Sequence, residues 1–336
     1  MQNKAFVTGA SGHLGSALTR SLSALGYQVT AGVRNITKAK LDNNIAGKIT
    51  HADLLNPDML SAAMDGADIV FQVAANFSHW SKNSQKEIIQ ANSDMVKNIF
   101  NAAHDTAVKK IIFVSSTGTL ARNTTGEIIS PNSWCENTYG NPYFQSKIET
   151  ERLAWSLAEK YHIEMVSVLP SAMINNDLSH STPTTRFLQS IFKGELPLDL
   201  EFDFNLVHIN DVSDAIARAG YAGQPSHRYI LANPQGLSVR DITRLAQKYN
   251  SAVKLPRKVG KNILLFIASL AELSKYLNIE PKLLKSQVHF YFNQKENYDI
   301  SLSSEHLNFS PRPMTECINE YFFALASFDP FLVQDL

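Results

Sequence analysis

The sequence of 336 residues is poor in cysteine and has no surplus of either charge. Its two cysteines, Cys135 and Cys317, are too few for a disulfide framework or a zinc cluster. Its 31 basic and 31 acidic side chains cancel, which argues against binding of nucleic acid through overall charge. We therefore expect neither a metal site nor a nucleic acid partner.

Long apolar runs are also missing. The longest, Ile263–Leu270 (ILLFIASL), is far shorter than the ~20 residues that span a bilayer. It predicts a buried helix, and a face for a membrane surface or a partner is the alternative. The N-terminal MQNK leads directly into an apolar strand, without the apolar region of a signal peptide. We expect a cytoplasmic protein with no transmembrane segment.

The residues that are present predict a folded α/β protein. The composition, 44% hydrophobic and 18% charged, is typical of globular proteins, and the length suits one large or two closely joined domains. Short apolar runs alternate with stretches of helical character, and this alternation predicts a Rossmann-type, doubly wound parallel sheet with helices on both faces. The runs are Ala5–Thr8, Gln28–Val33, Ile69–Ala74, Lys110–Ser115 and Glu164–Leu169.

A glycine-rich turn follows the first apolar run. FVTGASGHLGSAL places Gly9, Gly12 and Gly15 between a strand and a helix. The first two glycines let backbone N–H groups approach a pyrophosphate at the positive end of the helix, and the third lets helix and strand pack closely. A plain turn is the alternative to this dinucleotide site. The residues expected to contact the dinucleotide are Gly9, Ser11, Gly12, His13, Leu14 and Gly15.

Carboxylates are missing from the first 41 residues, since the first acidic residue is Asp42. The second run therefore ends without a carboxylate for an unphosphorylated ribose, and it is followed by Arg34, Lys38 and Lys40 instead. An arginine there suits the 2′-phosphate of NADP, so NADP(H) is expected over NAD(H), with ordinary surface charges as the alternative. Asp53, with Leu54 beside it, is expected near the adenine.

A tyrosine and a lysine stand four residues apart in NPYFQSKIETE. Tyr143 and Lys147 would share one face of a helix, and a neighbouring ammonium group is expected to lower the pKa of the phenol. Hydroxyl side chains at 115–117 end the strand before them, where such a sheet binds its ligand. A second match, Tyr291 and Lys295, lies outside the alternating region and is interpreted as coincidental.

The pattern loosens after Pro170. SAMINNDLSHSTPTT has the polar composition of a loop, and helical segments dominate after Ser238. We expect a smaller, mainly helical substrate domain here. The dinucleotide-binding domain is assigned to residues 1–169 and 206–233, and the substrate domain to residues 170–205 and 234–336.

Six motifs in this order resemble those of a known family. TGASGHLG, DIVFQVAA, FVSSTGTL, YFQSK, VHINDVSDAIARA and NFSPRP resemble the extended short-chain dehydrogenase/reductase family, and within it the dihydroflavonol reductase-like branch. The resemblance covers nearly the whole chain. It implies Ser116 as the hydroxyl that polarises a substrate oxygen, with Thr117 as the alternative, Tyr143 as the general acid/base and Lys147 as its cationic partner.

Further positions follow from the same resemblance. It implies that Ala74 and Ala75 line the cofactor, and that Pro170 and Ser171 run beside the nicotinamide. Lys147 would also hold the ribose of the cofactor. Asn92 is expected to be structural. His208 is interpreted as a packed or hydrogen-bonded residue and not as a catalyst or metal ligand.

The substrate pocket is the least specified part. The aromatic side chains after the fourth run could form an apolar rim over the nicotinamide or could pack a long loop, and both interpretations stay open. The segment LPSAMINN departs from that of the family's nucleotide-sugar epimerases, although Arg186 or Arg228 could still meet a diphosphate. The candidate substrate residues are Phe77, His79, Trp80, Thr117 and Trp134.

The sequence thus predicts an NADPH-dependent reductase of a medium-sized apolar or aromatic aldehyde or ketone. The alternatives are a nucleotide-sugar epimerase or dehydratase, a 3β-hydroxysteroid-type dehydrogenase and, from another class, a regulatory protein that senses NADP. A homodimer is expected from the same resemblance.

Overall fold

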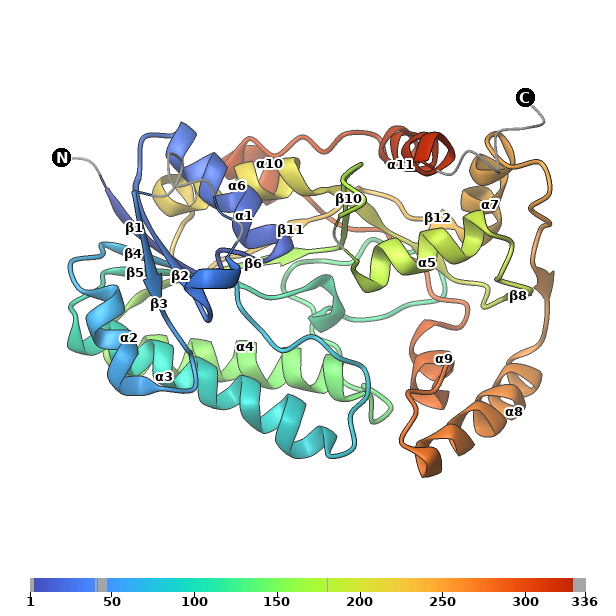
Figure 1. Ribbon diagram of the computed structural model, residues 1–336, viewed down its shortest axis with the longest axis horizontal. Coiled ribbons are helices and arrows are strands. Elements are labelled where there is room, and N and C mark those ends of the chain that lie inside the picture. Colours follow the sequence, from blue (N-terminus) through green and yellow to red (C-terminus); the bar gives the residue numbers. More distant parts are fainter. Residues whose placement is uncertain (1–2, 40, 42–46, 180, 329–336) are drawn as a thin grey trace.

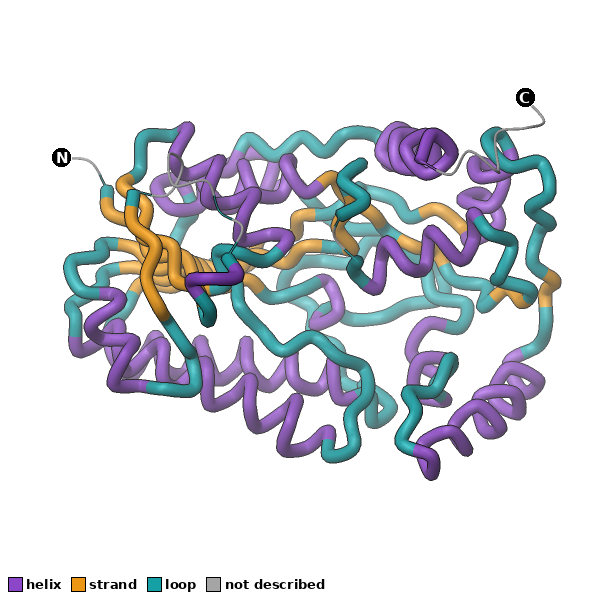
Figure 2. The backbone as a smooth tube through the Cα atoms, viewed as in Figure 1, coloured by secondary structure: helices purple, strands orange, loops and turns teal. Residues whose placement is uncertain are grey.

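One parallel sheet of seven strands forms the centre of the molecule (Figures 1 and 2). This computed structural model describes residues 3–39, 41, 47–179 and 181–328, so the expected phosphate contact Lys40 lies outside the described residues. The strand order is β11-β6-β5-β4-β1-β2-β3. The strands are β1 (Lys4–Thr8), β2 (Gln28–Val33), β3 (Lys48–His51), β4 (Ile69–Gln72), β5 (Lys110–Val114), β6 (Glu164–Pro170) and β11 (Arg228–Leu231).

The order of the strands confirms the predicted doubly wound fold. It reverses between β1 and β4, which is where such sheets open a crevice at their carboxyl ends. The apolar runs became strands because both faces of the sheet are covered; all five residues of β5 (KIIFV) are buried. Four of the five predicted strands agree with the structure within one residue at each end, and β4 ends two residues earlier than predicted.

Two layers of helices cover the sheet (Figure 1). Helices α1 (His13–Ala24), α6 (Ile209–Ala222) and α10 (Ser301–Leu307) pack on one face. Helices α2 (Pro57–Met64), α3 (Ala91–Asp105) and α4 (Pro142–Tyr161) pack on the other. The predicted sheet with helices on both faces is therefore confirmed.

Helix α4 begins where the sequence predicts it. Pro142 stands at its first position, and the side chain of Asn141 accepts hydrogen bonds from the backbone N–H groups of Tyr143 and Phe144. The helix ends at Tyr161 and is capped by His162, whose backbone is left-handed with φ +54°. Asn141 is fully buried, so this cap fixes the first turn, which carries Tyr143.

A second core lies beyond the carboxyl ends of the main strands. It is built by β7 (Ala172–Ile174), α5 (Pro183–Phe192), α7 (Val239–Gln247) and α11 (Met314–Phe328). The expected loop after Pro170 is interrupted by β7, which pairs with β10 (Leu206–His208). Short strand pairs join β8 (Leu198–Asp199) to β13 (Arg257–Lys258) and β9 (Asp203–Phe204) to β12 (Leu237–Ser238).

The C-terminal third also contributes to the first core. Leu307 and Phe309, at the end of α10, pack with α1 and α6 against the sheet. The segment therefore crosses back over the half that contains the seven-stranded sheet before α11 returns to the second core. The division of the chain into two domains at the residues given above stays a prediction.

The prediction for the apolar run at 263–270 is half right. The run forms α8 (Lys261–Ala271), but only Leu264 and Ala268 are buried, while Ile263, Phe266 and Leu270 are 54%, 65% and 54% exposed. The expectation of a buried helix is wrong because α8 packs on one side only, against α9 (Lys285–Tyr291). Among the described residues, no helix is long and apolar enough to cross a membrane.

The hydroxyl of Thr8 fastens β1 to the turn after β4. It accepts hydrogen bonds from the N–H groups of Val73 (2.9 Å) and Ala74 (3.0 Å) and donates to the side-chain oxygen of Gln72 (2.9 Å). Thr8 is fully buried, so water cannot replace these bonds.

We predict that Thr8→Val lowers the free energy of unfolding by about 2 to 4 kcal/mol, because it leaves the N–H groups of Val73 and Ala74 without the acceptor that the buried hydroxyl provides. Guanidinium unfolding monitored by circular dichroism measures this loss. Thr8→Ser is the control, since it keeps the hydroxyl and loses one methyl group, at a cost of about 1 kcal/mol. Equal stability of the Val and Ser variants would contradict the assigned role.

Candidate active site

The glycine loop lies at the switch point of the sheet and accepts no larger residue at two positions. Gly9 has φ +62°, and a Cβ there would lie 2.9 Å from the Cβ of Ala74. A Cβ on Gly15 would lie 2.1 Å from the carbonyl oxygen of Gly9. Gly12 precedes α1, whose first turn has no acidic side chain. The first N–H groups of a helix have no partner within it, so this end of α1 suits an anion.

The other residues of the glycine loop that were predicted to contact the dinucleotide differ in how far their side chains are exposed. Ser11 is exposed and His13 is half-buried, with its Nε2 3.3 Å from Oδ1 of Asn175. The side chain of Leu14 is buried in the core under α1, so only its backbone can face a ligand.

The residues expected around the adenosine follow two neighbouring strands. Arg34 comes directly after β2 and Lys38 ends the 3-10 helix Ile36–Lys38, and both are exposed. Asp53 is half-buried, and its Oδ1 accepts the N–H of Leu55 at 3.1 Å. Leu54 is buried in the core, so its side chain is a packing residue.

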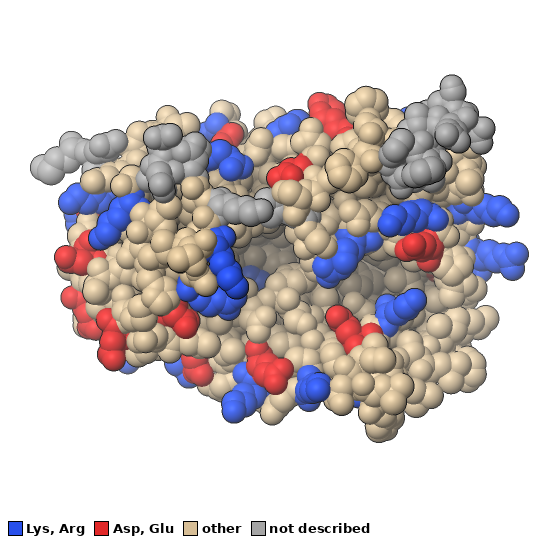
Figure 3. Space-filling view, in the orientation of Figure 1, with Lys and Arg blue, Asp and Glu red and all other residues tan. Residues whose placement is uncertain are grey.

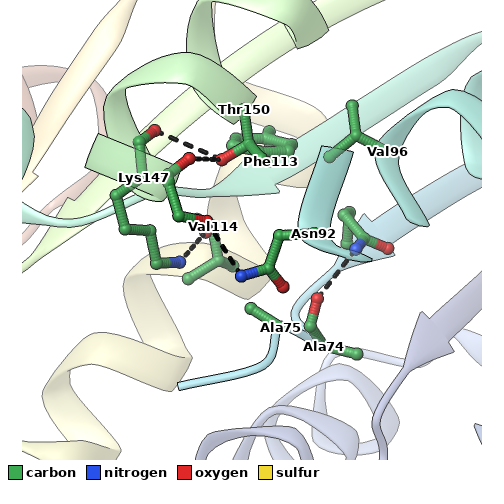
Figure 4. A pocket seen from close by; sticks show the side chains of 10 residues that line it. Ala74, Ala75, Asn92, Val96, Phe113, Val114, Lys147 and Thr150 are labelled. Carbon is green, nitrogen blue, oxygen red and sulfur yellow. Dashed lines mark hydrogen bonds between the residues drawn. The ribbon is translucent and has the colours of Figure 1, made fainter. Parts of the chain in front are cut away.

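A small pocket opens between the ends of β4 and β5 and α4 (Figure 4). Ala74 and Ala75 form one side, and Val114 and Lys147 form the other. Asn92 of α3 fixes the backbone just after Ala75: it accepts from the N–H of Asn76 at 2.7 Å and donates to Asn76 O at 3.0 Å. It also donates to the hydroxyl of Ser146 on α4 at 2.9 Å. These bonds agree with the structural role expected for Asn92.

Ser116, Tyr143 and Lys147 come together at this edge of the sheet. Tyr143 is buried, and the hydroxyl of Ser116 lies within hydrogen-bonding reach of its phenol. The same hydroxyl accepts from the N–H of Gly118 at 3.1 Å. Lys147 lies one turn further along α4 and donates to the carbonyl oxygen of Val114 at 3.3 Å. Thr117, the alternative hydroxyl, is buried beside Tyr298.

The pKa values of this group correct one expectation. Burial raises the pKa of Tyr143 to about 12, and the bond from Ser116 opposes that rise only in part. Burial also lowers the pKa of Lys147 to about 8, against the opposing effect of the Glu151 carboxylate. The expected lowering of the phenol pKa by Lys147 is therefore wrong for the protein alone, because loss of hydration outweighs any effect of the cation.

Ser171 stands at the carboxyl end of β6, next to the buried Pro170. Its N–H bonds to Leu231 O at 3.1 Å, which holds β6 to β11. Its hydroxyl is buried and has no hydrogen-bond partner among the described residues. Such an orphaned group is uncommon, and a bound ligand is one explanation for it.

Two of the candidate substrate residues form a wall beside the phenol. The ring of Phe77 lies 4.3 Å from that of Tyr143, and the ring of His79 lies 4.8 Å from it. Nδ1 of His79 is 3.2 Å from Oδ1 of Asn141, the cap of α4, and burial lowers the pKa of His79. Trp80, next along the loop, is half-buried.

Trp134 and Arg228 contact each other. The guanidinium of Arg228 lies 3.9 Å from the centre of the Trp134 ring. This contact favours the packing role that the sequence left open for Trp134. Arg228 is buried and bonded to protein groups on all sides, so the suggestion that it meets a diphosphate is wrong. Arg186 is exposed on α5.

The partners of Arg228 include the buried carboxylate of Glu151. Nε of Arg228 lies 2.8 Å from Oε1 of Glu151, and its NH2 lies 3.0 Å from Oε2. Ser115 and Ser167 donate to the same carboxylate at 2.6 and 2.7 Å. Burial alone would raise the pKa of Glu151, but Arg228 and the two hydroxyls hold it below its ordinary value.

The sequence did not predict the part of the site that comes from the C-terminal third. Phe290 of α9 stacks on Phe144 with ring centres 3.5 Å apart, and the guanidinium of Arg122 lies 4.2 Å above Phe290. Arg122 pairs with the buried Glu296 at 2.9 Å. Tyr291, from the second Tyr–Lys match, packs in the same cluster, with its ring 5.7 Å from that of Phe144.

Lys295, the lysine of the second match, forms its ion pair elsewhere and not with Tyr291. It pairs with Asp203 at 3.0 Å, so the interpretation of Tyr291 and Lys295 as a coincidental spacing holds for the pair. His208 caps α6, and its Nδ1 lies 2.7 Å from NH2 of Arg312, which makes it the acceptor of a hydrogen bond. Arg312 also pairs with Asp211 at 2.8 Å, which joins the motifs VHINDV and NFSPRP.

The fold and this site define a class of dinucleotide-dependent enzymes. The profile described as "NAD dependent epimerase/dehydratase family" matches residues 5–232. The chain belongs to this family and is an NAD(P)-dependent oxidoreductase.

Two curated relatives are reductases. An anthocyanidin reductase of Vitis vinifera is 26% identical over 329 residues, which cover 89% of this chain and 94% of the relative. A dihydroflavonol 4-reductase of Hordeum vulgare is 27% identical over 271 residues, which cover 75% and 76%. The predicted resemblance to the dihydroflavonol reductase-like branch is therefore confirmed at the level of distant homology.

Solved structures share the fold. A UDP-glucose 4-epimerase from Thermotoga maritima superposes with a TM-score of 0.75 at 17% identity and covers 97% of this chain and 99% of its own. The yeast methylglyoxal/isovaleraldehyde reductase Gre2, complexed with NADPH, superposes with a TM-score of 0.69 at 17% identity and covers 97% and 98%.

We predict that Glu151→Gln lowers the free energy of unfolding by about 3 to 5 kcal/mol, because it leaves the buried guanidinium of Arg228 without a counter-charge. Urea unfolding at neutral pH measures the loss. The double variant Glu151→Leu/Arg228→Met is the control, since it removes both charges and should recover most of the stability. A Gln variant as stable as the wild type would contradict the assigned role of the pair.

The ion pair of Glu151 and Arg228 should also make the free energy of unfolding depend on pH. The pKa of Glu151 is lowered in the folded protein, so its contribution is present above the unfolded pKa of about 4.5 and is lost as pH falls through the folded value. Below about pH 4.5, the wild type should therefore lose stability more steeply than Glu151→Gln.

Proposed function

We propose that the protein reduces a medium-sized aldehyde or ketone to an alcohol with NADPH. The observation that carries this proposal is the meeting of Ser116, Tyr143 and Lys147 beside the switch point of the sheet. The three side chains supply a hydrogen-bond donor, a phenol and a cation at one edge of a dinucleotide fold, which is what carbonyl reduction requires.

The residues of the crevice fit a dinucleotide. Gly9 and Gly15 leave space that a Cβ would fill, the first turn of α1 carries no carboxylate, and the hydroxyl of Ser171 lacks a partner among the described residues. The proposed contacts are Gly9, Ser11, Gly12, His13, Leu14, Gly15, Arg34, Lys38, Asp53, Leu54, Ala74, Ala75, Tyr143, Lys147, Pro170 and Ser171. NADPH, when bound, supplies the hydride for the carbonyl carbon.

The proton comes from this chain. Tyr143 donates its phenolic proton to the developing alkoxide, and Ser116 donates a hydrogen bond to the same oxygen. Since the pKa of Tyr143 is about 12, the phenol stays protonated at neutral pH and can act as a donor. Lys147, whose pKa is about 8, is mainly charged at neutral pH and stabilises the phenolate that remains after proton transfer.

The surroundings favour an apolar or aromatic substrate. Phe77 and His79 line one side of the phenol, and the Phe144–Phe290 stack lies behind it. Apolar walls with a few polar groups are typical of pockets for small organic molecules. The relatives named as anthocyanidin and dihydroflavonol reductases agree with this class of substrate. A cytoplasmic location and a homodimer stay predictions from the sequence.

We predict that Tyr143→Phe lowers kcat by about 100- to 10,000-fold, because it removes the proton donor and keeps the ring. NADPH oxidation at 340 nm across a panel of aldehydes, aromatic ketones and flavonoid carbonyls measures turnover. Binding of NADPH, followed by tryptophan fluorescence, should change little.

Tyr221→Phe is the matched control, since Tyr221 is exposed on α6 and its variant should keep full turnover. Undiminished turnover by Tyr143→Phe would disprove the catalytic assignment. A wild type that binds NADPH and reduces no carbonyl compound of the panel would instead favour the epimerase or the sensor.

We predict that Arg34→Ala weakens NADPH binding by about 10- to 100-fold and NADH binding by less than about 3-fold, because only NADPH has a 2′-phosphate for the guanidinium. Titration calorimetry with both cofactors measures the two constants. Arg244→Ala is the control, since Arg244 is exposed on α7 and pairs there with Asp241. Equal weakening of both cofactors would count against the preference for NADP.

A further inference from the structure

An exposed apolar stripe runs along α8 and the 3-10 helix η4 (Glu272–Leu277) that continues it. Its large side chains are far more exposed than is usual for such residues, and they adjoin one another along the helix. We call this set the α8 face. It consists of Ile263, Phe266, Leu270, Leu273, Tyr276 and Leu277.

The spacing puts the stripe on one side of the helix. At 100° per residue, Ile263, Phe266 and Leu270 fall within about 60° of one another, and Leu273 and Leu277 continue the same line. Leu264 and Ala268, the two buried residues of α8, lie on the opposite side and pack with Val288 of α9. The fold of the chain therefore uses one side of α8 and leaves the other, equally apolar side uncovered by any described residue.

The segment around the α8 face is strongly basic. Residues 254–285 contain seven basic and two acidic side chains, a net formal charge of +5, whereas the rest of the chain, with 24 basic and 29 acidic side chains, has −5. Lys254, Arg257 and Lys282 are exposed and make no ion pair with a described residue. Figure 3 shows an uncharged surface at the lower right, where Figure 1 has α8, and Lys and Arg side chains along the right-hand edge above it.

We propose that the α8 face binds the surface of an anionic phospholipid bilayer. An apolar helix face flanked by lysine and arginine is the pattern of helices that lie in the plane of a membrane interface. The apolar side chains would enter the boundary between headgroups and acyl chains, and the basic side chains would contact the anionic headgroups. Because no described helix can span a bilayer, this binding is peripheral.

The charge favours a bilayer over a second copy of the chain. Two α8 faces in a symmetric contact would bring two segments of net charge +5 together, and such like charges oppose association. An anionic surface has the opposite charge. This inference rests on α8 and its neighbours alone and does not depend on the proposed reduction.

Sedimentation with lipid vesicles tests the proposal. We expect the purified protein to bind vesicles of phosphatidylcholine and phosphatidylglycerol at least about tenfold more strongly than vesicles of phosphatidylcholine alone, and to dissociate as salt rises. Phe266→Ser/Leu270→Ser should weaken binding by at least about tenfold, because it removes apolar side chains and keeps the charge. Lys254→Gln/Arg257→Gln/Lys282→Gln should weaken it on the order of 100-fold, at about fivefold per charge at low salt.

Phe323→Ser is the matched control, since Phe323 is 63% exposed on α11, away from the basic segment, and its variant should bind like the wild type. Thermal melts followed by circular dichroism check that each variant is folded. Absence of wild-type binding, or equal binding by Phe266→Ser/Leu270→Ser, overturns the proposal. A dimer by light scattering that Phe266→Ser/Leu270→Ser converts to monomers, without vesicle binding, assigns the α8 face to a second copy instead.

Discussion

The buried ion pair of Glu151 and Arg228 holds together the elements that carry the candidate site. Glu151 lies one turn after Lys147 on α4, and its carboxylate accepts bonds from Ser115 at the end of β5 and Ser167 in β6. Arg228, in the edge strand β11, donates to Thr119 at 2.7 Å and to the carbonyl oxygens of Pro131 and Ser133 at 2.5 and 3.0 Å. The start and the middle of the loop between β5 and α4 are thereby fixed against the sheet.

The pair is costly to bury, and its value lies in geometry more than in net stability. Removing a carboxylate and a guanidinium from water costs several kcal/mol each, which their attraction offsets only when every remaining donor and acceptor is satisfied. Here the two carboxylate oxygens receive four hydrogen bonds and the guanidinium finds carbonyl and hydroxyl acceptors. These bonds allow few other arrangements of the groups involved. Because Ser115 is bonded to Glu151 of α4, the next residue, Ser116, is held in place relative to Tyr143 and Lys147 on the same helix.

Features of this structure could be predicted from the sequence when the interacting residues are close together in the chain, and could not when they are far apart. The strands and the start of α4 were predictable because burial on both faces and an Asn-Pro cap leave local patterns. Glu151 and Arg228 are 77 residues apart, and neither stands in a pattern that identifies the other. The pKa of Tyr143 was predicted with the wrong sign because spacing gives the distance to a cation along a helix but not the loss of water around the phenol. For α8, the apolar run predicted a helix. Whether such a helix is buried on one side or on all sides depends on the elements that pack against it, which the run itself does not show.

The proposed role of the α8 face is consistent with the proposed substrates of the candidate active site. The proposed substrates, which suit the ring of Phe77 beside Tyr143, are apolar compounds that are sparingly soluble in water and partition into bilayers. An enzyme whose α8 face rests on a bilayer would meet such compounds at a higher local concentration than in bulk water. Because α9 packs against α8 on one side and supplies Phe290 to the aromatic cluster around Tyr143, one short segment would connect the surface that binds the bilayer with the packing behind Tyr143. The exposed apolar side of α8 and the proposed preference for apolar substrates would then have one common explanation, namely access to substrates that dissolve poorly in water.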